Sequence, residues 1–347
     1  MRNTASATAR APFPSAKPRN VVLLCNYDVQ RRIGVRTAKS IGQALLEATA
    51  ETRDAVVPLP LPDVDAALRA WIQLHGGSVW NGLRVTDNAP CGCRGVIATA
   101  PLPAEAARTA PLIVVPERLY MTSDDARQLL QPLEAKRFSL SFWREDLPGA
   151  VQLAVLLAVE RQRGDDSFWA PYVRSLPASP PCAWALTDAE LSRALAALGP
   201  GTAGWERAVA AARRSVYQRA EQTVQRYGRH LPGELSADDV VWAMGQVLSR
   251  SFGREPDVAL APYIDLCNHR HGAPRPGGFV DEQDGVSYAF VESSSFGEPR
   301  ALLAGDEVYV SYIAAGGDPL STFLNLGFVP PELQPLLLLP GAERRRG

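Results

Sequence analysis

The spacing of the apolar residues in this chain changes from a strand pattern to a helix pattern and back again. These two changes constrain the fold more than any other feature. Two short strand-like segments, 95-GVIATA-100 and 112-LIVVP-116, stand apart across turn-forming residues. A long helical stretch follows, and 307-EVYVSYI-313 then returns to the alternation of a strand. Strands on both sides of a helical stretch predict one β-rich α+β domain that a helical insert interrupts.

The helices are predicted from apolar spacing and from residues that cap helix ends. Thr187 with Glu190, and Ser236 with Asp239, have the spacing of a capping box, in which two residues satisfy each other's free backbone N–H groups. Gly76 follows a helical pattern at the position of a C-cap. The predicted helices cover residues 66–75, 150–163, 188–197 and 204–229, and a further one runs from 237 toward 252.

The composition excludes several classes of protein. A net charge of −1 provides no general attraction for nucleic acid or for an anionic membrane surface. No apolar run approaches the roughly 20 residues that cross a bilayer. Five cysteines in 347 residues do not form the disulfide framework of a secreted domain. We therefore expect a protein of a reducing compartment that binds neither nucleic acid nor membrane.

The first 40 residues differ from the rest of the chain. They carry eight Arg or Lys and a single acid, Asp28, and Ser and Thr are frequent in 4-TASATARAPFPSA-16. This composition is typical of an organelle transit peptide and equally of a disordered basic tail, and both interpretations stay open. A transit peptide indicates the chloroplast, whereas a tail leaves the cytoplasm or the nucleus.

The stretch 261-APYIDLCNHRHG-272 holds two of the four histidines of the chain. On an extended strand Cys267, His269 and His271 would point to one side, as ligands of a zinc ion do. The sequence offers no second ligand pair with suitable spacing, and Cys91-Gly-Cys93 alone is a weak signal. A G-x-S-x-G elbow and the glycine motifs that bind phosphate are also missing. We therefore predict no metal site and a structural role for Cys267.

Several motifs occur in collinear order between about residues 66 and 330. They are 92-GCRGVIATAPL-102, 115-VPERLYMT-122, 167-SFWAPYVRSLP-177, 249-SRSFGR-254, 262-PYIDLCNH-269, 305-GDEVYVSYI-313 and 325-NLGFVP-330. With these motifs the sequence resembles the SET-domain protein methyltransferases, in the branch typified by the Rubisco large-subunit lysine methyltransferase. Each motif is weak alone, and the combination is specific.

The resemblance implies a SET fold, with short twisted sheets and a threaded C-terminal segment. It also implies methyl transfer from S-adenosylmethionine to a lysine nitrogen of a protein; a protein histidine as acceptor and an inactive SET-like binding module are alternatives. The expected partner is the Rubisco large subunit or another protein, and the expected state is a monomer. The expected units are an extension (1–62), two parts of the SET domain (63–146 and 246–330), a helical insert (147–245) and a tail (331–347).

The resemblance assigns roles to individual residues. Tyr312 corresponds to the catalytic tyrosine, whose hydroxyl orients the acceptor nitrogen. On the cofactor side are Asn268, His269, Arg94, Gly95 and Phe328. On the substrate side are Arg250, Asp265 and Arg254. For Arg250 and Asp265 a structural ion pair is an alternative to substrate contact, and either Phe279 or Tyr288 supplies a further aromatic wall.

The sequence departs from the branch at two places. The usual G-x-G loop is replaced by Gly92-Cys93-Arg94-Gly95, and the side chain of Cys93 is expected to narrow the approach to the cofactor. The branch also continues beyond 325-NLGFVP-330 into a helical domain that helps to select substrates, whereas this sequence ends about twenty residues later. Two explanations stay open: the helical domain that docks the substrate is lost, or the sequence is a truncated form.

Overall fold

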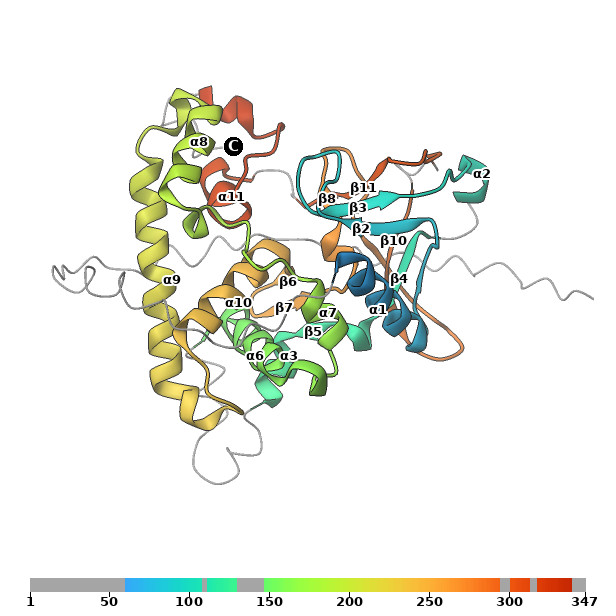
Figure 1. Ribbon diagram of the computed structural model, residues 1–347, viewed down its shortest axis with the longest axis horizontal. Coiled ribbons are helices and arrows are strands. Elements are labelled where there is room, and N and C mark those ends of the chain that lie inside the picture. Colours follow the sequence, from blue (N-terminus) through green and yellow to red (C-terminus); the bar gives the residue numbers. More distant parts are fainter. Residues whose placement is uncertain (1–59, 108–110, 130–146, 294–299, 313–316, 339–347) are drawn as a thin grey trace, which may run out of the picture.

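The structure is a computed structural model of the chain, and it describes residues 60–107, 111–129, 147–293, 300–312 and 317–338 (Figure 1). The possible transit peptide, apart from residues 60–62, and the last part of the predicted tail, 339–347, lie outside the described residues.

After one N-terminal helix the chain forms strands, then a block of helices, and then strands again, as the sequence predicts. The α-helices are α1 Leu61–Leu74, α2 Ala104–Ala107, α3 Ser123–Gln128, α6 Gly149–Arg163, α7 Ala170–Ser175, α8 Asp188–Leu198, α9 Trp205–Tyr227, α10 Ala237–Arg250 and α11 Pro319–Leu326. The strands are β1 Ser78–Val79, β2 Leu83–Thr86, β3 Gly95–Ala98, β4 Ile113–Pro116, β5 Met121–Thr122, β6 Phe252–Arg254, β7 Asp257–Leu260, β8 Asn268–His269, β9 Gly277–Val280, β10 Ser287–Val291 and β11 Glu307–Val310.

Three small sheets each join strands from before the helical block to strands from after it. Their strand orders are β1-β4-β10-β9, β2-β3-β11-β8 and β5-β7-β6. In the first sheet, for example, Val115 of β4 lies opposite Ala289 of β10. Figure 1 shows most of the sheet structure beside the helices α6, α9 and α10. The predicted α+β domain, in which helices interrupt a β-rich part, is confirmed.

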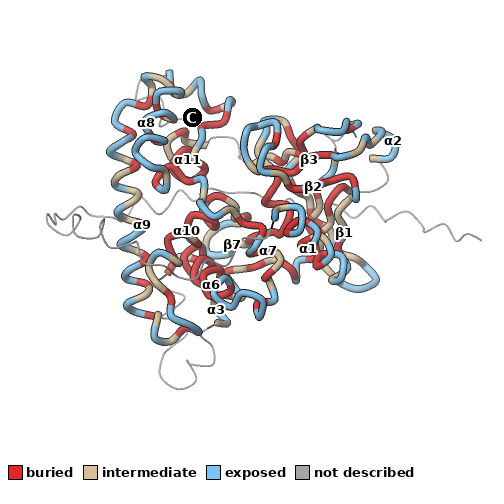
Figure 2. Tube along the Cα trace, viewed as in Figure 1, coloured by how far each residue is buried: buried red, intermediate tan, exposed pale blue. Residues whose placement is uncertain are grey.

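Helix α6 forms the centre of the helical block, and α3 and α10 pack against it. Its residues from Gly149 to Glu160 are buried on every side (Figure 2). A helix in that position needs small or apolar residues on all its faces, which the run AVQLAVLLAV provides except at Gln152, whose amide donates to the main-chain oxygen of Leu147 at 3.2 Å. Helix α9 lies at the edge of the block and exposes one face. Among the described residues, no helix is both long and apolar enough to cross a membrane.

Both predicted capping boxes form, and they set the starts of α8 and α10. The Glu190 carboxylate accepts from the backbone N–H of Thr187 at 2.8 Å, and the Thr187 hydroxyl accepts from the backbone N–H of Glu190. Ser236 and Asp239 make the same reciprocal contacts at α10. Local sequence therefore decides where these two helices begin.

The predicted strand at 307–313 ends early, at Val310. After Val310 the chain leaves the ladder, because Ser311 N donates to the main-chain oxygen of Pro274 at 3.0 Å. The next N–H, of Tyr312, donates to a side-chain nitrogen of His269 at 3.0 Å. The alternating pattern is correct for the strand itself, but side-chain contacts redirect its end toward the cluster described below.

Candidate active site

Four segments meet at the end of the sheet that contains β8 and β11. They are the loop 89–94, the segment 261–269, the two described residues after β11, and a C-terminal segment that contributes Glu332. Strand β8 runs parallel to β11, with Asn268 opposite Tyr309 and His269 opposite Val310. Because successive residues of a strand face opposite sides, Asn268 and His269 serve two different parts of this cluster.

Asn268 joins β8 to the loop before β3. Its Nδ2 donates to the main-chain oxygen of Arg94 at 2.9 Å, to Glu307 Oε1 at 2.7 Å and to Cys91 Sγ at 3.2 Å. Since these neighbours all accept, they determine which end of the amide faces the loop. Among the described residues, none donates a hydrogen bond to Asn268 Oδ1, so this oxygen is available to a ligand.

Gly95 lies where the loop enters β3, directly against Asn268. A Cβ at this position would meet Asn268 Nδ2 and would lie 2.7 Å from Glu307 Oε1, so a larger residue would push β3 and β8 apart. The neighbouring Arg94 directs its side chain elsewhere, to Asp87 at 2.7 Å and to a main-chain oxygen of α7 at 2.9 Å. Arg94 therefore contributes its main-chain oxygen to the cluster and uses its guanidinium to position the loop.

Glu307 organises this part of the cluster, although the sequence analysis does not single it out. Its buried carboxylate accepts from Asn268, from the backbone N–H of Cys91 at 3.0 Å and from the hydroxyl of Tyr309 at 2.7 Å. The feature that could have indicated a role for Glu307 is its charge at the first position of β11, where it and the next residue are both buried. A buried carboxylate requires several hydrogen-bond donors, and here the loop and β8 provide them.

His269 links β8 to the C-terminal segment and to Tyr312. Its Nδ1 accepts from the backbone N–H of Tyr312 at 3.0 Å, and its Nε2 lies 2.6 Å from Glu332 Oε1. A ring nitrogen that accepts carries no proton, so the proton of this neutral imidazole is on Nε2, which donates to Glu332. Burial opposes the charge of Glu332, yet its backbone hydrogen bond and the one from His269 hold its pKa below the usual value.

Tyr312 places its hydroxyl beside the segment that precedes β8. The hydroxyl donates to the main-chain oxygen of Cys267 at 2.5 Å, and the ring lies 5.4 Å from that of His269. Burial raises the pKa of Tyr312 well above its usual value, and the positive charge of Arg250 opposes this shift. The phenol therefore remains protonated at neutral pH and acts as a hydrogen-bond donor, not as a base.

Arg250 and Asp265 lie together, but the ion pair that is one of the two alternatives for their side chains does not form. Arg250 Nη1 donates to the main-chain oxygen of Asp265 at 2.8 Å, and its Nε donates to Gln246 at 3.1 Å. The Asp265 carboxyl accepts instead from the Tyr172 hydroxyl, and its Oδ1 has no partner among the described residues. Burial raises the pKa of Asp265 to about 7, against the lowering effects of Arg250 and Tyr172.

Tyr263 brings the chain into the site with an unusual backbone conformation. Its backbone φ angle is 67°, and residues other than glycine rarely adopt a positive φ. The ring is fully buried, and its hydroxyl donates to Asp65 of α1 at 2.8 Å. Asp65 also accepts from the backbone N–H of Val85 in β2 at 3.2 Å. Helix α1, β2 and the segment 261–269 are therefore tied together at the point where the backbone turns.

Two predicted residues are not brought into this cluster. Phe328 follows Gly327 at the end of α11, and 40% of its surface is exposed. Arg254 is exposed in the β6–β7 hairpin opposite Asp257. The two candidates for an aromatic wall, Phe279 and Tyr288, stack on each other with ring centroids 5.0 Å apart. Their roles at a bound substrate or cofactor remain predictions.

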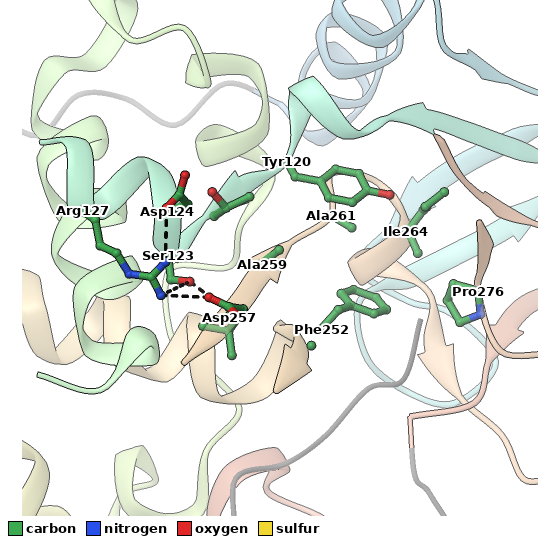
Figure 3. Close-up of a pocket in the computed structure, with 14 residues that line it drawn as sticks. Tyr120, Ser123, Asp124, Arg127, Phe252, Asp257, Ala259, Ala261, Ile264 and Pro276 are labelled. Carbon is green, nitrogen blue, oxygen red and sulfur yellow. Dashed lines mark hydrogen bonds and ion pairs between the residues drawn. The ribbon is translucent and has the colours of Figure 1, made fainter. Parts of the chain in front are cut away.

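A cavity of about 470 Å³ adjoins the segment 261–264 (Figure 3). Its apolar lining consists of Tyr120, Phe252, Ala261, Ile264, Pro276 and Ala289, among others. At its polar end Arg127 contacts Asp257 at 3.0 Å and Asp124 at 3.3 Å (Figure 3). Asn268, His269 and Tyr312 do not line this cavity. It therefore neighbours the cluster through the segment 261–269 and does not contain it.

Two of the three side chains of the C-x-H-x-H pattern approach the same carboxylate, since His269 Nε2 and His271 Nδ1 lie 2.6 Å and 3.7 Å from Glu332 Oε1. Cys267 is buried and its thiol lies 3.9 Å from the main-chain oxygen of Tyr263, whereas His269 is engaged by Glu332. The side chain of His271 is 75% exposed. In the part of the chain that the structure describes, no three His, Cys, Asp or Glu side chains are grouped to hold a metal ion.

Comparison with solved structures identifies the fold. The structure of Rubisco LSMT bound to AdoMet matches with a TM-score of 0.56 at 20% identity, covering 77% of this chain and 57% of that chain. The SET domain of LSMT bound to Lysine and AdoHcy matches with a TM-score of 0.57 at 20% identity, covering 78% of this chain and 58% of that one. The fold is that of the SET-domain methyltransferases.

Sequence comparison relates the chain to the same branch, although no family model matches it. The chloroplastic ribulose-1,5-bisphosphate carboxylase/oxygenase large subunit N-methyltransferase of Nicotiana tabacum is 26% identical over 193 residues, which cover 52% of this chain and 37% of that protein. Actin-histidine N-methyltransferase of Rattus norvegicus is 25% identical over 254 residues, 71% of this chain and 39% of that protein. The matched regions thus span less than two fifths of these curated relatives.

Proposed function

We propose that this chain is a protein methyltransferase that moves a methyl group from S-adenosylmethionine to a lysine side chain. The observation that supports this function most directly is the meeting of Asn268, His269 and Tyr312 at one pair of parallel strands. His269 and Tyr312 are 43 residues apart in the sequence, so their contact depends on the fold and not on local sequence.

The residues of the cluster fit S-adenosylmethionine. This cofactor supplies a methyl group on a cationic sulfur and carries an amino-acid end with an ammonium and a carboxylate. Asn268 Nδ2 already donates to Arg94, Glu307 and Cys91. Its Oδ1 receives no hydrogen bond from the described residues and is therefore available to accept from the ammonium. Gly95 lets the loop and β8 approach closely enough to form one wall. The relatives solved with AdoMet or AdoHcy support the same choice.

The acceptor nitrogen has to be neutral when it attacks the methyl carbon. Removing a proton from a free lysine near pH 7 costs about 4.6 kcal/mol, since its usual pKa is about 10.4. A site poor in water reduces this cost by disfavouring the ammonium form. The protonated Tyr312 hydroxyl, which now donates to Cys267, is suited to orient the nitrogen and not to take its proton. Alignment and desolvation, rather than a general base, are the proposed sources of catalysis.

A histidine acceptor is the second candidate, and the match to actin-histidine N-methyltransferases favours it. An imidazole with a usual pKa of about 6.5 is mostly neutral at pH 7, so it needs less desolvation than lysine. The two acceptors therefore differ in pH dependence. Transfer to lysine is expected to rise with pH well above 7, whereas transfer to histidine is expected to level off near pH 7.

The first test is calorimetric titration of the full chain with S-adenosylmethionine and with S-adenosylhomocysteine. Binding at micromolar concentration is expected, and its absence would reject both enzyme candidates. The wild type and Tyr312→Phe are then incubated with a protein extract and methyl-labelled cofactor. The variant is expected to bind cofactor with little change and to lose transfer, because only the hydroxyl is removed. Amino-acid analysis of labelled protein distinguishes methyl-lysine from methyl-histidine.

Tyr217→Phe is the matched control, since it removes the same hydroxyl from an exposed residue of α9 that lies outside the cluster. Equal loss of transfer in both variants would contradict a special role for Tyr312. Cofactor binding without transfer to any protein in the extract would favour an inactive SET-like binding module.

We propose the chloroplast as the location and the Rubisco large subunit as a candidate substrate, and expect the chain to act as a monomer. The basic N-terminal composition and the tobacco relative support the location. Imaging of the chain with a C-terminal fluorescent protein in plant cells tests it, and a cytoplasmic or nuclear signal would contradict it. Incubation with purified Rubisco tests the substrate.

A further inference from the structure

Cys91 and Cys93 form an exposed pair of thiols that the proposed methyl transfer does not use. Their sulfur atoms are 3.0 Å apart, and both residues are exposed. By contrast, Cys182 and Cys267 are buried. The pair occupies the loop in which the sequence departs from the G-x-G pattern.

The backbone of the loop holds the two thiols side by side. Gly92, between them, has a φ of 85°, a conformation that favours glycine and turns the chain back on itself. Ala89 closes this turn, because its N–H donates to the main-chain oxygen of Cys93 at 2.9 Å and its carbonyl accepts from Gly92 N at 2.7 Å. The hydrogen bonds of this turn therefore hold the two sulfur atoms in contact. The space beside Gly92 is open, because a Cβ added there would have no atom within 4 Å.

The same turn is connected to the candidate active site through Cys91. Its Sγ accepts from Asn268 Nδ2 at 3.2 Å, and its backbone N–H donates to Glu307 Oε2 at 3.0 Å. A disulfide has its sulfurs about 2.05 Å apart, so bond formation moves them about 1 Å closer together. We expect that movement to change the contact between Cys91 Sγ and the Asn268 amide.

We propose that Cys91 and Cys93 form a reversible disulfide by exchange with a low-molecular-weight disulfide such as oxidised glutathione, and that Asn268 responds to its state. The Cys93 thiolate attacks one sulfur of the small disulfide, forms a mixed disulfide and releases one thiolate. Cys91, as its thiolate, then attacks the Cys93 sulfur and expels the second small thiolate. Two protein thiols are oxidised, one small disulfide is reduced to two thiols, and the two protein protons end on those thiols or in solvent.

The order of the two attacks follows from the surroundings of Cys91. Partial desolvation of the exposed Cys91 thiol and its contacts with Cys93 and Glu307 raise its pKa, so little of it is thiolate and it is a poor initial nucleophile. After the mixed disulfide forms, Cys91 needs only to reach a sulfur that is already its neighbour. Proximity then compensates for its low thiolate fraction.

The test uses the full chain with Cys25→Ser, because Cys25 lies outside the described residues and is a possible competing partner. The protein is equilibrated without denaturant in buffers of increasing oxidised-to-reduced glutathione ratio, alkylated and digested with trypsin. Cleavage after Arg84 and Arg94 gives the peptide 85-VTDNAPCGCR-94, which contains both thiols. The expected result is a complete shift to an unalkylated peptide lighter by two hydrogens, reversed by reduced glutathione.

Cys182 and Cys267 serve as controls within the same sample, and both are expected to stay reduced until the chain is unfolded. Cys91→Ser is expected to stop the reaction at a glutathione adduct on Cys93. If the wild-type peptide keeps both thiols, or carries glutathione without closing the internal bond, the proposed disulfide is wrong.

The second part of the inference, the response of Asn268, rests on the proposed function. Oxidation is expected to weaken S-adenosylhomocysteine binding about tenfold, equivalent to about 1.4 kcal/mol, and reduction to restore it. Cys93→Ser is expected to abolish the dependence on oxidation. Equal affinity in both redox states would reject the coupling. Failure of the reduced chain to bind would instead reject the proposed function, while the mass measurement would still decide whether the disulfide forms.

Discussion

Replacing the buried Asp265 by asparagine is expected to stabilise the protein at pH 8 much more than at pH 5. Asp265 is 3% exposed, and burial raises its pKa from 3.8 to about 7 against the opposing effects of Arg250 and Tyr172. Between these two pKa values the folded protein keeps a proton that the unfolded chain has lost. Stability therefore falls as pH rises through this window and becomes constant above about pH 7.

The size of the effect follows from the pKa difference. Each pH unit within the window costs about 1.4 kcal/mol, and about two units separate pH 5 from the folded-state pKa. The wild type should thus lose about 3 kcal/mol between pH 5 and pH 8 through this residue. Asparagine does not titrate, and its side-chain oxygen can still accept from the Tyr172 hydroxyl.

The assay is urea unfolding of wild type and Asp265→Asn at pH 5 and pH 8, at equal ionic strength. The quantity compared is the difference in unfolding free energy between the two proteins, because other titrating groups cancel in it. Asp166→Asn, an exposed position, is the matched control and should shift by less than about 0.5 kcal/mol. A wild type–variant difference that is equal at both pH values would refute the argument.

Two further predictions concern the contacts around β8. Gly95→Ala places a methyl group against the Asn268 amide, so we expect the unfolding free energy to fall by about 1 to 3 kcal/mol. We also expect the variant to lose S-adenosylhomocysteine binding, measured by calorimetry. Gly228→Ala is the control and should change neither quantity, because the nearest atom to its added Cβ is 3.4 Å away. Glu332→Gln removes a carboxylate whose pKa is lowered in the fold, so the variant should be less stable at pH 7 and equal to the wild type once pH falls below the folded pKa of Glu332. An unchanged difference at low pH in urea unfolding would contradict the role of its bond from His269.

The parts of the fold that depend on local sequence could be predicted. Capping boxes identified the starts of α8 and α10, because the relevant contacts span only three residues. The alternating pattern identified β11 but not its end at Val310, after which the backbone N–H groups of Ser311 and Tyr312 donate to Pro274 and His269. The pairing of β4 with β10 could not be read from the pattern, since any of several short apolar segments could fill either place.

The site was predicted unevenly for a similar reason. Asn268, His269 and Tyr312 carry the motif of a known branch, and the fold brings them together. Glu307 lies inside the motif 305-GDEVYVSYI-313 but was not singled out, and Glu332 lies outside every motif, because an acid is recognised as a site residue only when burial and distant donors surround it. The sequence suggests a pair between Arg250 and Asp265 but not that a main-chain oxygen takes the guanidinium. That choice depends on how the turn 264–266 presents its carbonyl groups.

The contacts of β8 also determine which variants can separate activity from stability. Asn268 binds the loop before β3, and His269 binds both Tyr312 and the C-terminal segment. Replacing either residue breaks contacts between segments distant in sequence, so lost activity in such a variant has a structural explanation as well as a chemical one. The Tyr312 side chain differs, because its hydroxyl has a single described contact, to the Cys267 carbonyl, while its backbone N–H makes the bond to His269. Tyr312→Phe preserves that backbone bond, and it therefore tests the chemistry with the smallest change to the fold.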